Sequence, residues 1–94
     1  MVYLISYELK SDDTETRYKR VHKAIKKASP VDIWLNPLES TYFIKSSETA
    51  EVIFNKIKPV FNQTDRFMVC EVSVNNFFVY LSEEHLEYLK KMFL

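Results

Sequence analysis

Hydrophobic and polar positions alternate along residues 2–9, which predicts a β-strand near the start of the chain. One face of this strand is wholly apolar and consists of Tyr3, Ile5, Tyr7 and Leu9. The opposite face is mixed and ends in the carboxylate of Glu8. We expect the apolar face to lie against helices and the mixed face to meet solvent or a second subunit.

A helical pattern follows the strand and runs to about Ala28, because apolar residues recur there every three or four positions: Tyr18, Val21, Ile25 and Ala28. Asp13 or Thr14 can cap the start of the helix, and Ser29-Pro30 ends it. The other faces of the helix are basic, with Arg17, Lys19, Arg20, Lys23, Lys26 and Lys27.

The remaining chain alternates between strand and helix patterns. Residues 31–36 and 40–45 predict a hairpin, Ser46-Ser47 offers a cap for a second helix, and Pro59 predicts a kink or an early end to that helix. Three further elements are expected: a strand over 66–74, a short strand over 77–80, and a final helix from about 82 to 93.

The order of these elements is βαββαβ, then a short strand and a helix, which predicts an α+β fold of the ferredoxin-like type. We expect one domain over residues 1–94, with a core over about 1–74 and a C-terminal extension over 75–94. Two helices would cover one face of an antiparallel sheet. The other face is partly apolar, so we expect it to pack on a symmetric copy.

Composition excludes several classes of protein. Lys plus Arg equals Asp plus Glu, so the protein is not basic overall, although one face can be. Glycine is absent, which excludes glycine-rich phosphate loops. Cys70 is the only cysteine, so an internal disulfide and a cysteine-built zinc site are excluded. Its apolar surroundings in the sequence predict a buried small hydrophobe.

The chain shows no sign of a membrane span or a leader. No apolar stretch approaches the ~20 residues that a membrane helix needs, and the start lacks a charged segment before an apolar run. We therefore expect a cytoplasmic protein without a membrane partner.

Several short motifs are similar to those of known proteins. Tyr7-Glu8, the acidic stretch 11–13, Arg17 with Arg20, and the polar-to-aromatic run 39–43 resemble the CRISPR-associated protein 2 family. A closer resemblance is to its uncharacterised SinR-like branch. It rests on residues 5–7, 38–41, 44–45, 65–66 and 81–84, and together these motifs span nearly the whole chain.

The resemblance implies a ferredoxin-like homodimer joined through its sheets, often with the last short strand crossing to the partner. Some members of the family cleave RNA or DNA with a divalent metal held by the strand-one Asp of each subunit. Others bind duplex nucleic acid without cutting it or act in toxin–antitoxin systems. At the position of the metal-binding Asp this chain has Glu8.

Glu8 is the candidate catalytic and metal-binding residue. Two such carboxylates across a two-fold axis could hold Mg²⁺ with a substrate phosphate. The extra methylene of Glu displaces the carboxylate by about an ångström, and a shift of that size can cost roughly a hundredfold in rate. The alternative is that Glu8 is the polar end of a strand and pairs with a Lys or Arg. Asp12 and Asp13 are either helix caps or ligands.

The basic helix is the candidate nucleic-acid-binding surface, through Arg17, Lys19, Arg20, Lys23 and Lys27. The alternative is a solvated helix face. His22 could act as a general base or be an ordinary surface histidine, and His85 is expected to be structural. Trp34 and Tyr42 either stack on a base or belong to the core or an interface.

Two hypotheses of function follow. The first is a small homodimeric nucleic-acid-associated protein, either a metal-dependent endonuclease using Mg²⁺ or a relative that binds without cutting. The second is a protein-interaction module without catalysis, of the antitoxin or mobile-element type. Zero net charge, Glu8 in place of Asp and the apolar strand face favour the second.

Overall fold

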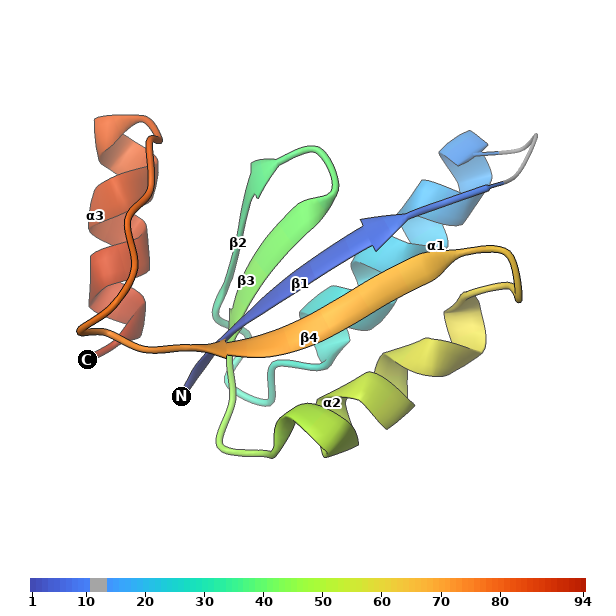
Figure 1. The fold of residues 1–94 in the computed structure, drawn as a ribbon, viewed down its shortest axis with the longest axis horizontal. Helices are drawn as coiled ribbons and strands as arrows, with labels where there is room; N and C mark the ends of the chain where they lie inside the picture. The colour runs from blue at the N-terminus through green and yellow to red at the C-terminus, as the bar shows by residue number, and fades with distance from the viewer. Residues whose placement is uncertain (11–13) are drawn as a thin grey trace.

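The computed structural model describes residues 1–10 and 14–94, so the predicted roles of Asp12 and Asp13 lie outside the described residues. Its elements in chain order are β1 (Val2–Glu8), α1 (Thr14–Lys27), β2 (Trp34–Leu38), β3 (Thr41–Lys45), α2 (Ala50–Ile57), the 3₁₀ turn η1 (Lys58–Val60), β4 (Arg66–Val72) and α3 (Glu83–Met92) (Figure 1).

The four strands form one antiparallel sheet in the order β2-β3-β1-β4. β1 therefore lies inside the sheet. It pairs with β3 from Val2 opposite Lys45 onward, and with β4 up to Glu8 opposite Arg66. The α+β architecture and the predicted hairpin of β2 and β3 are confirmed.

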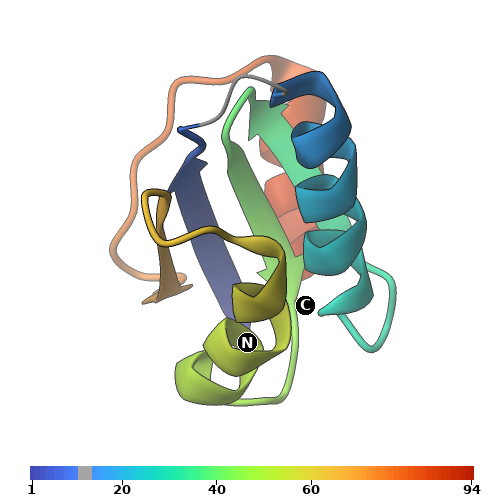
Figure 2. The same cartoon turned by 90° about the vertical axis from the view of Figure 1, so that its right-hand side faces the viewer.

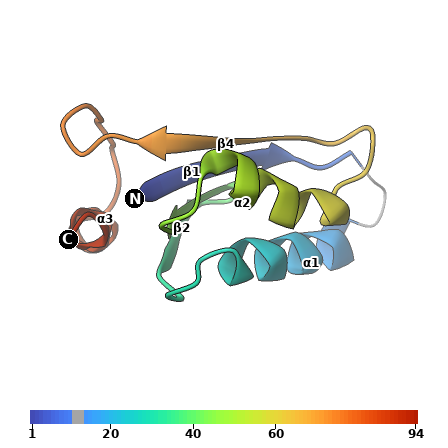
Figure 3. The same ribbon diagram turned by 90° about the horizontal axis from the view of Figure 1, so that it is seen from below.

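α1 and α2 lie together on one face of the sheet (Figures 2 and 3). The apolar face of β1 packs beneath them, as predicted. The buried residues of this layer include Tyr3, Ile5, Tyr7, Val21, Ile25, Tyr42, Ile44, Ile53 and Ile57. Because Val21 and Ile25 are fully buried, the rotation of α1 about its axis is fixed. Lys19, Arg20, Lys23 and Lys27 are therefore exposed, whereas Arg17 is buried.

The C-terminal extension covers part of the other face of the sheet. Leu89 and Met92 of α3 pack against Val2, Leu35 and Phe43 in a second apolar cluster. α3 stands beside β2 (Figure 1). The expectation that a symmetric copy covers this apolar face is thus wrong for the β2 and β3 side, because the chain's own helix covers it.

The predicted strand over residues 77–80 is wrong. Within the described ranges, this segment pairs with no strand, so the alternation in its sequence does not produce a hydrogen-bonded ladder. The alternation does decide its burial: Phe77 and Val79 pack on the second cluster, whereas Phe78 and Tyr80 are 104% and 103% exposed.

Cys70 is exposed, contrary to the prediction of a buried hydrophobe. It lies opposite Leu4 on the edge strand β4, on the face that does not meet α1 and α2. Met68 shares that face and is also exposed. The extension therefore leaves an apolar strip of β4 in contact with solvent.

Helix ends agree with the sequence in part. α2 ends at Ile57, two residues before Pro59, and continues as η1, which confirms the early end. Its cap is Thr49, whose side chain accepts a hydrogen bond from the backbone of Val52, and not the predicted Ser46-Ser47. Among the described helices, none is long and apolar enough to cross a membrane.

Candidate nucleic-acid interface

The exposed cations of α1 form one surface, which we call the α1 cation face: Lys19, Arg20, Lys23 and Lys27. The buried stripe of the helix places these side chains in solvent, as the sequence predicts. A shallow hollow of about 350 Å³ on this helix is lined by Lys19, His22, Lys23, Lys26 and Lys27. Positive charge is therefore concentrated on one side of a protein that is neutral overall.

Arg17 departs from this arrangement. Its guanidinium is buried and forms a two-pronged ion pair with Asp65, in which Arg17 Nη1 donates to Asp65 Oδ1 over 3.2 Å. The backbone N–H groups of Lys10 and Asn62 also donate to this carboxylate, over 2.8 and 2.7 Å. Arg17 is thus a structural residue, and the prediction that it contacts phosphates is corrected.

The hydrogen bonds at Asp65 set its charge state. The Arg17 guanidinium holds the pKa of the Asp65 carboxyl well below its usual range, and the two backbone donors act in the same direction against the opposing effect of burial. Asp65 is therefore ionised at neutral pH, and its ion pair fixes the start of α1 beside the start of β4.

A second hollow lies at the outer edge of the sheet, beside β2. We call it the β2-edge hollow; it has a volume of about 650 Å³. Strand residues Trp34, Asn36 and Tyr42 line it, together with His85 and Tyr88 from α3. His22 and Lys26 line both this hollow and the shallow one on α1, so the two are neighbours.

Aromatic contacts shape the β2-edge hollow. The ammonium group of Lys26 lies 4.3 Å from the centre of the Trp34 ring, a cation–π arrangement. Trp34 and Tyr42 have ring centres 6.0 Å apart. Asn36 donates from its side-chain amide to the carbonyl groups of Leu38 and Thr41, which fixes that side chain at the edge of the sheet.

His22 is half-buried, which contradicts the alternative of an ordinary surface histidine. Its Nε2 lies 2.6 Å from the hydroxyl of Tyr7, and its ring meets the rings of Tyr18 and Tyr42 edge-on. Desolvation, and then the charge of Lys26, lower the pKa of His22 below its ordinary value. The imidazole is therefore neutral at pH 7, and one of its nitrogens is already hydrogen-bonded.

Glu8 is the last residue of the inner strand β1, where β1 pairs with the edge strand β4, and β3 separates that strand from β2 and its hollow. Its carboxylate is 3.0 Å from the ammonium group of Lys10, and both side chains are more than half exposed. Arg66 is its partner across the strands. In the described part of the chain, no group of three or more His, Cys, Asp or Glu is placed to hold a metal ion.

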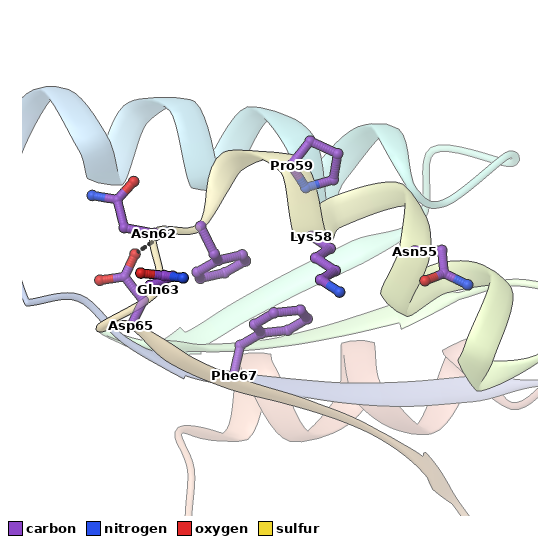
Figure 4. A pocket seen from close by; sticks show the side chains of 8 residues that line it. Asn55, Lys58, Pro59, Asn62, Gln63, Asp65 and Phe67 are labelled. Atoms are coloured by element: carbon purple, nitrogen blue, oxygen red, sulfur yellow. Dashed lines mark hydrogen bonds between the residues drawn. The ribbon is translucent and has the colours of Figure 1, made fainter.

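A third hollow lies between α2, η1 and the start of β4, and has a volume of about 520 Å³ (Figure 4). Phe61 and Phe67 stack in it with ring centres 4.2 Å apart. Asn55, Lys58 and Gln63 contribute polar groups, and Asp65 is already engaged by Arg17. This hollow is separate from the α1 cation face and adds no further cation to it.

The sequence leaves Trp34 and Tyr42 open to stacking on a base or to a place in the core or an interface, and Tyr42 lies in the core. It gives no indication of Tyr88, and the expectation for His85 is a structural role. The spacing of His85 and Tyr88, three apart on one helix, places them on one helical face. Only the docking of α3 beside β2 brings that face to the hollow. No protein-family model matches the chain, and no curated protein sequence does.

Proposed function

We propose that this protein binds nucleic acid through the α1 cation face and acts as a cytoplasmic homodimer of ferredoxin-like fold. The strand order β2-β3-β1-β4, with α1 and α2 on one face, supports a split β–α–β arrangement. The proposal keeps the resemblance to the CRISPR-associated protein 2 family and its SinR-like branch as its starting point.

The observation that carries the proposal is the α1 cation face. Its four cations stand in solvent on one rigid helix, and none of them forms an ion pair with a residue in the described ranges. Each phosphate that such a cation neutralises releases a counterion, so binding should weaken steeply with salt. Zero net charge limits the long-range attraction, which means that the affinity should be modest.

The arrangement of Glu8 favours a protein that binds nucleic acid over one that cleaves it. Its carboxylate is paired with Lys10, which is the expected arrangement for a polar strand end. A Mg²⁺-dependent nuclease would need the Glu8 carboxylates of two copies to approach one another and this pairing to be exchanged for metal. We therefore propose that this protein binds nucleic acid without cutting it. Mg²⁺-dependent cleavage is the alternative, and a cleavage assay tests it.

The exposed apolar residues of the edge strand and the extension support a homodimer. Met68 and Val74 are each more than half exposed, and Phe78 and Tyr80 are fully exposed. A chain of 94 residues buries only about 60–65% of its unfolded surface, so covering these residues would stabilise it.

The same residues favour the second candidate function, a protein-interaction module of the antitoxin or mobile-element type. In that case a different protein would cover Phe78 and Tyr80, and the α1 cation face would be a solvated surface. The two candidates differ in whether purified protein alone binds nucleic acid.

The test is a binding titration with fluorescein-labelled RNA and DNA at low salt. Lys23→Glu with Lys27→Glu should weaken binding at least tenfold, because it places two negative charges on the α1 cation face. The matched control is Lys58→Glu with Lys90→Glu, which makes the same charge change on η1 and α3 and should alter affinity much less. Equal losses in both variants, or no binding by the wild-type protein, would contradict the proposal.

A further inference from the structure

We infer that the β2-edge hollow holds one nucleobase of a single-stranded nucleic acid whose phosphates lie along the α1 cation face. This inference rests on the proposed function and adds the class of nucleic acid and the place of a base. The shared chemistry is a flat aromatic heterocycle joined to a phosphate, as found in a strand and in a free nucleotide.

The lining of the hollow suits a heterocyclic base. Aromatic rings come from Trp34 and Tyr88, which can offer a face or an edge to a flat ring. Tyr42 is 1% exposed and packs against Trp34 from the core side. The amide oxygen of Asn36 can accept a hydrogen bond, because its two N–H groups already donate to Leu38 and Thr41, and the imidazole of His85 can donate or accept one. A base needs both kinds of contact, whereas an aliphatic side chain or a lipid tail would leave the polar groups unpaired.

Charge is placed where the phosphate of such a ligand would lie. Lys26 stands between the two hollows, with its ammonium group over Trp34 and its side chain also beside Lys23 and Lys27. In a nucleotide, the base and the phosphate are separated by one sugar. A base beside Trp34 therefore brings its phosphate within reach of Lys26, and the next phosphates within reach of the α1 cation face.

The arrangement fits a single strand better than a duplex. In a duplex both faces of every base are stacked on neighbouring bases, so no face is free to meet Tyr88 or Trp34. In a single strand, a base can turn out of the stack and lie on an aromatic side chain while cations follow the backbone. The hollow between β2 and α3 accepts one turned-out base beside such a track.

Tyr88 is the best residue for a test of this inference. It is 43% exposed on α3, so replacing it leaves the buried residues Leu89 and Met92 in place. Tyr88→Ala removes the ring, and Tyr88→Phe keeps it without the hydroxyl. Val52→Ala is the control, because it shortens a side chain that is 40% exposed on α2 and does not line the hollow.

Trp34 supplies a second and independent readout. It is the only tryptophan in the chain, so a base that stacks in the hollow should quench the intrinsic fluorescence of the protein. The ligand is an oligothymidylate of about 12 nucleotides, a length within the usual range of one small binding domain. An abasic strand of equal length keeps the phosphates and lacks the bases; thymidine monophosphate and a duplex complete the set.

The expected result has three parts. The oligothymidylate binds and quenches the fluorescence of Trp34. The abasic strand binds more weakly and does not quench it. Tyr88→Ala weakens binding of the oligothymidylate by about 5- to 100-fold and does not weaken binding of the abasic strand. Tyr88→Phe and Val52→Ala keep affinities close to that of the wild-type protein.

Other results overturn the inference in distinguishable ways. Equal affinity for the abasic strand, without quenching by either ligand, leaves the proposed function standing and removes the base site. Quenching by thymidine monophosphate at the same concentration as by the oligothymidylate, or equal quenching by the duplex, removes the assignment to a single strand. No binding of any strand removes the proposed function together with the inference.

Discussion

The guanidinium of Arg17 and the carboxylate of Asp65 form a buried ion pair that ties the first half of α1 to the residue before β4. These side chains are 10% and 0% exposed, and the carboxylate also accepts two backbone hydrogen bonds. The pair holds α1 in place on the sheet. It therefore helps to orient the α1 cation face, although neither residue belongs to that face.

Removing one partner of this pair should destabilise the protein strongly. Arg17→Ala leaves the Asp65 carboxylate buried without its cation, which should lower the free energy of unfolding by about 3 kcal/mol or more. Urea denaturation followed by circular dichroism measures the change. The exposed pair of Glu8 and Lys10 is the control, and Lys10→Ala should cost less than about 1 kcal/mol. Equal losses in the free energy of unfolding in the two variants would contradict a stabilising role for the buried Arg17 pair.

Stability should also fall in mild acid because of His22. Its folded-state pKa is lowered, so the neutral form stabilises the fold, and this contribution is present above the unfolded value of about 6.5. It is lost as the pH falls from about 7 toward the lowered pKa, because the unfolded state then binds the proton more readily. His22→Gln should reduce the loss of unfolding free energy over this range. An identical pH dependence in wild-type protein and variant would contradict the packing of His22 against Tyr7.

The sequence predicts the central architecture well because burial has a simple period. The alternation of β1 and the helical stripe of α1 each identify a buried face without reference to other elements. Pro59 likewise ends α2 by a local steric effect. These predictions depend on residues close to one another in the chain, and they are correct.

Apart from the cap of α2, which is Thr49 and not Ser46-Ser47, the errors depend on contacts between distant residues. Arg17 looks like its basic neighbours until Asp65, 48 positions away, meets it. Cys70 lies in an apolar run, but the edge position of β4 exposes it. Residues 77–80 alternate like a strand, yet a strand also needs a partner beside it. The β2-edge hollow could not be predicted either, because it depends on where α3 docks.

Glu8 should contribute little to any cleavage. The proposal of binding without cutting predicts that wild-type protein and Glu8→Ala degrade labelled RNA and DNA equally slowly in Mg²⁺, with rates near that of buffer alone. Gel electrophoresis of the labelled strands measures both. Mg²⁺-dependent cleavage that disappears in Glu8→Ala and persists in Lys10→Ala would instead establish a nuclease that uses this carboxylate.

The exposed aromatic residues of the extension should stabilise the homodimer. Phe78→Ser with Tyr80→Ser removes two fully exposed rings and should shift the protein toward monomer at micromolar concentration, while its circular dichroism spectrum stays unchanged. Sedimentation velocity measures the shift. Leu38→Ser, which changes an exposed apolar residue at the turn between β2 and β3, is the control. A wild-type protein that is wholly monomeric would contradict the homodimer.

The most direct test of the α1 cation face is the salt dependence of binding to a single strand. Four phosphate contacts predict that the logarithm of affinity falls against the logarithm of salt concentration with a slope of about −2 to −3. Lys23→Glu with Lys27→Glu should make the slope shallower by about 1.4, while Lys58→Glu with Lys90→Glu should leave it unchanged. No binding at about 50 mM salt, or a slope that the α1 reversal does not alter, would contradict the account.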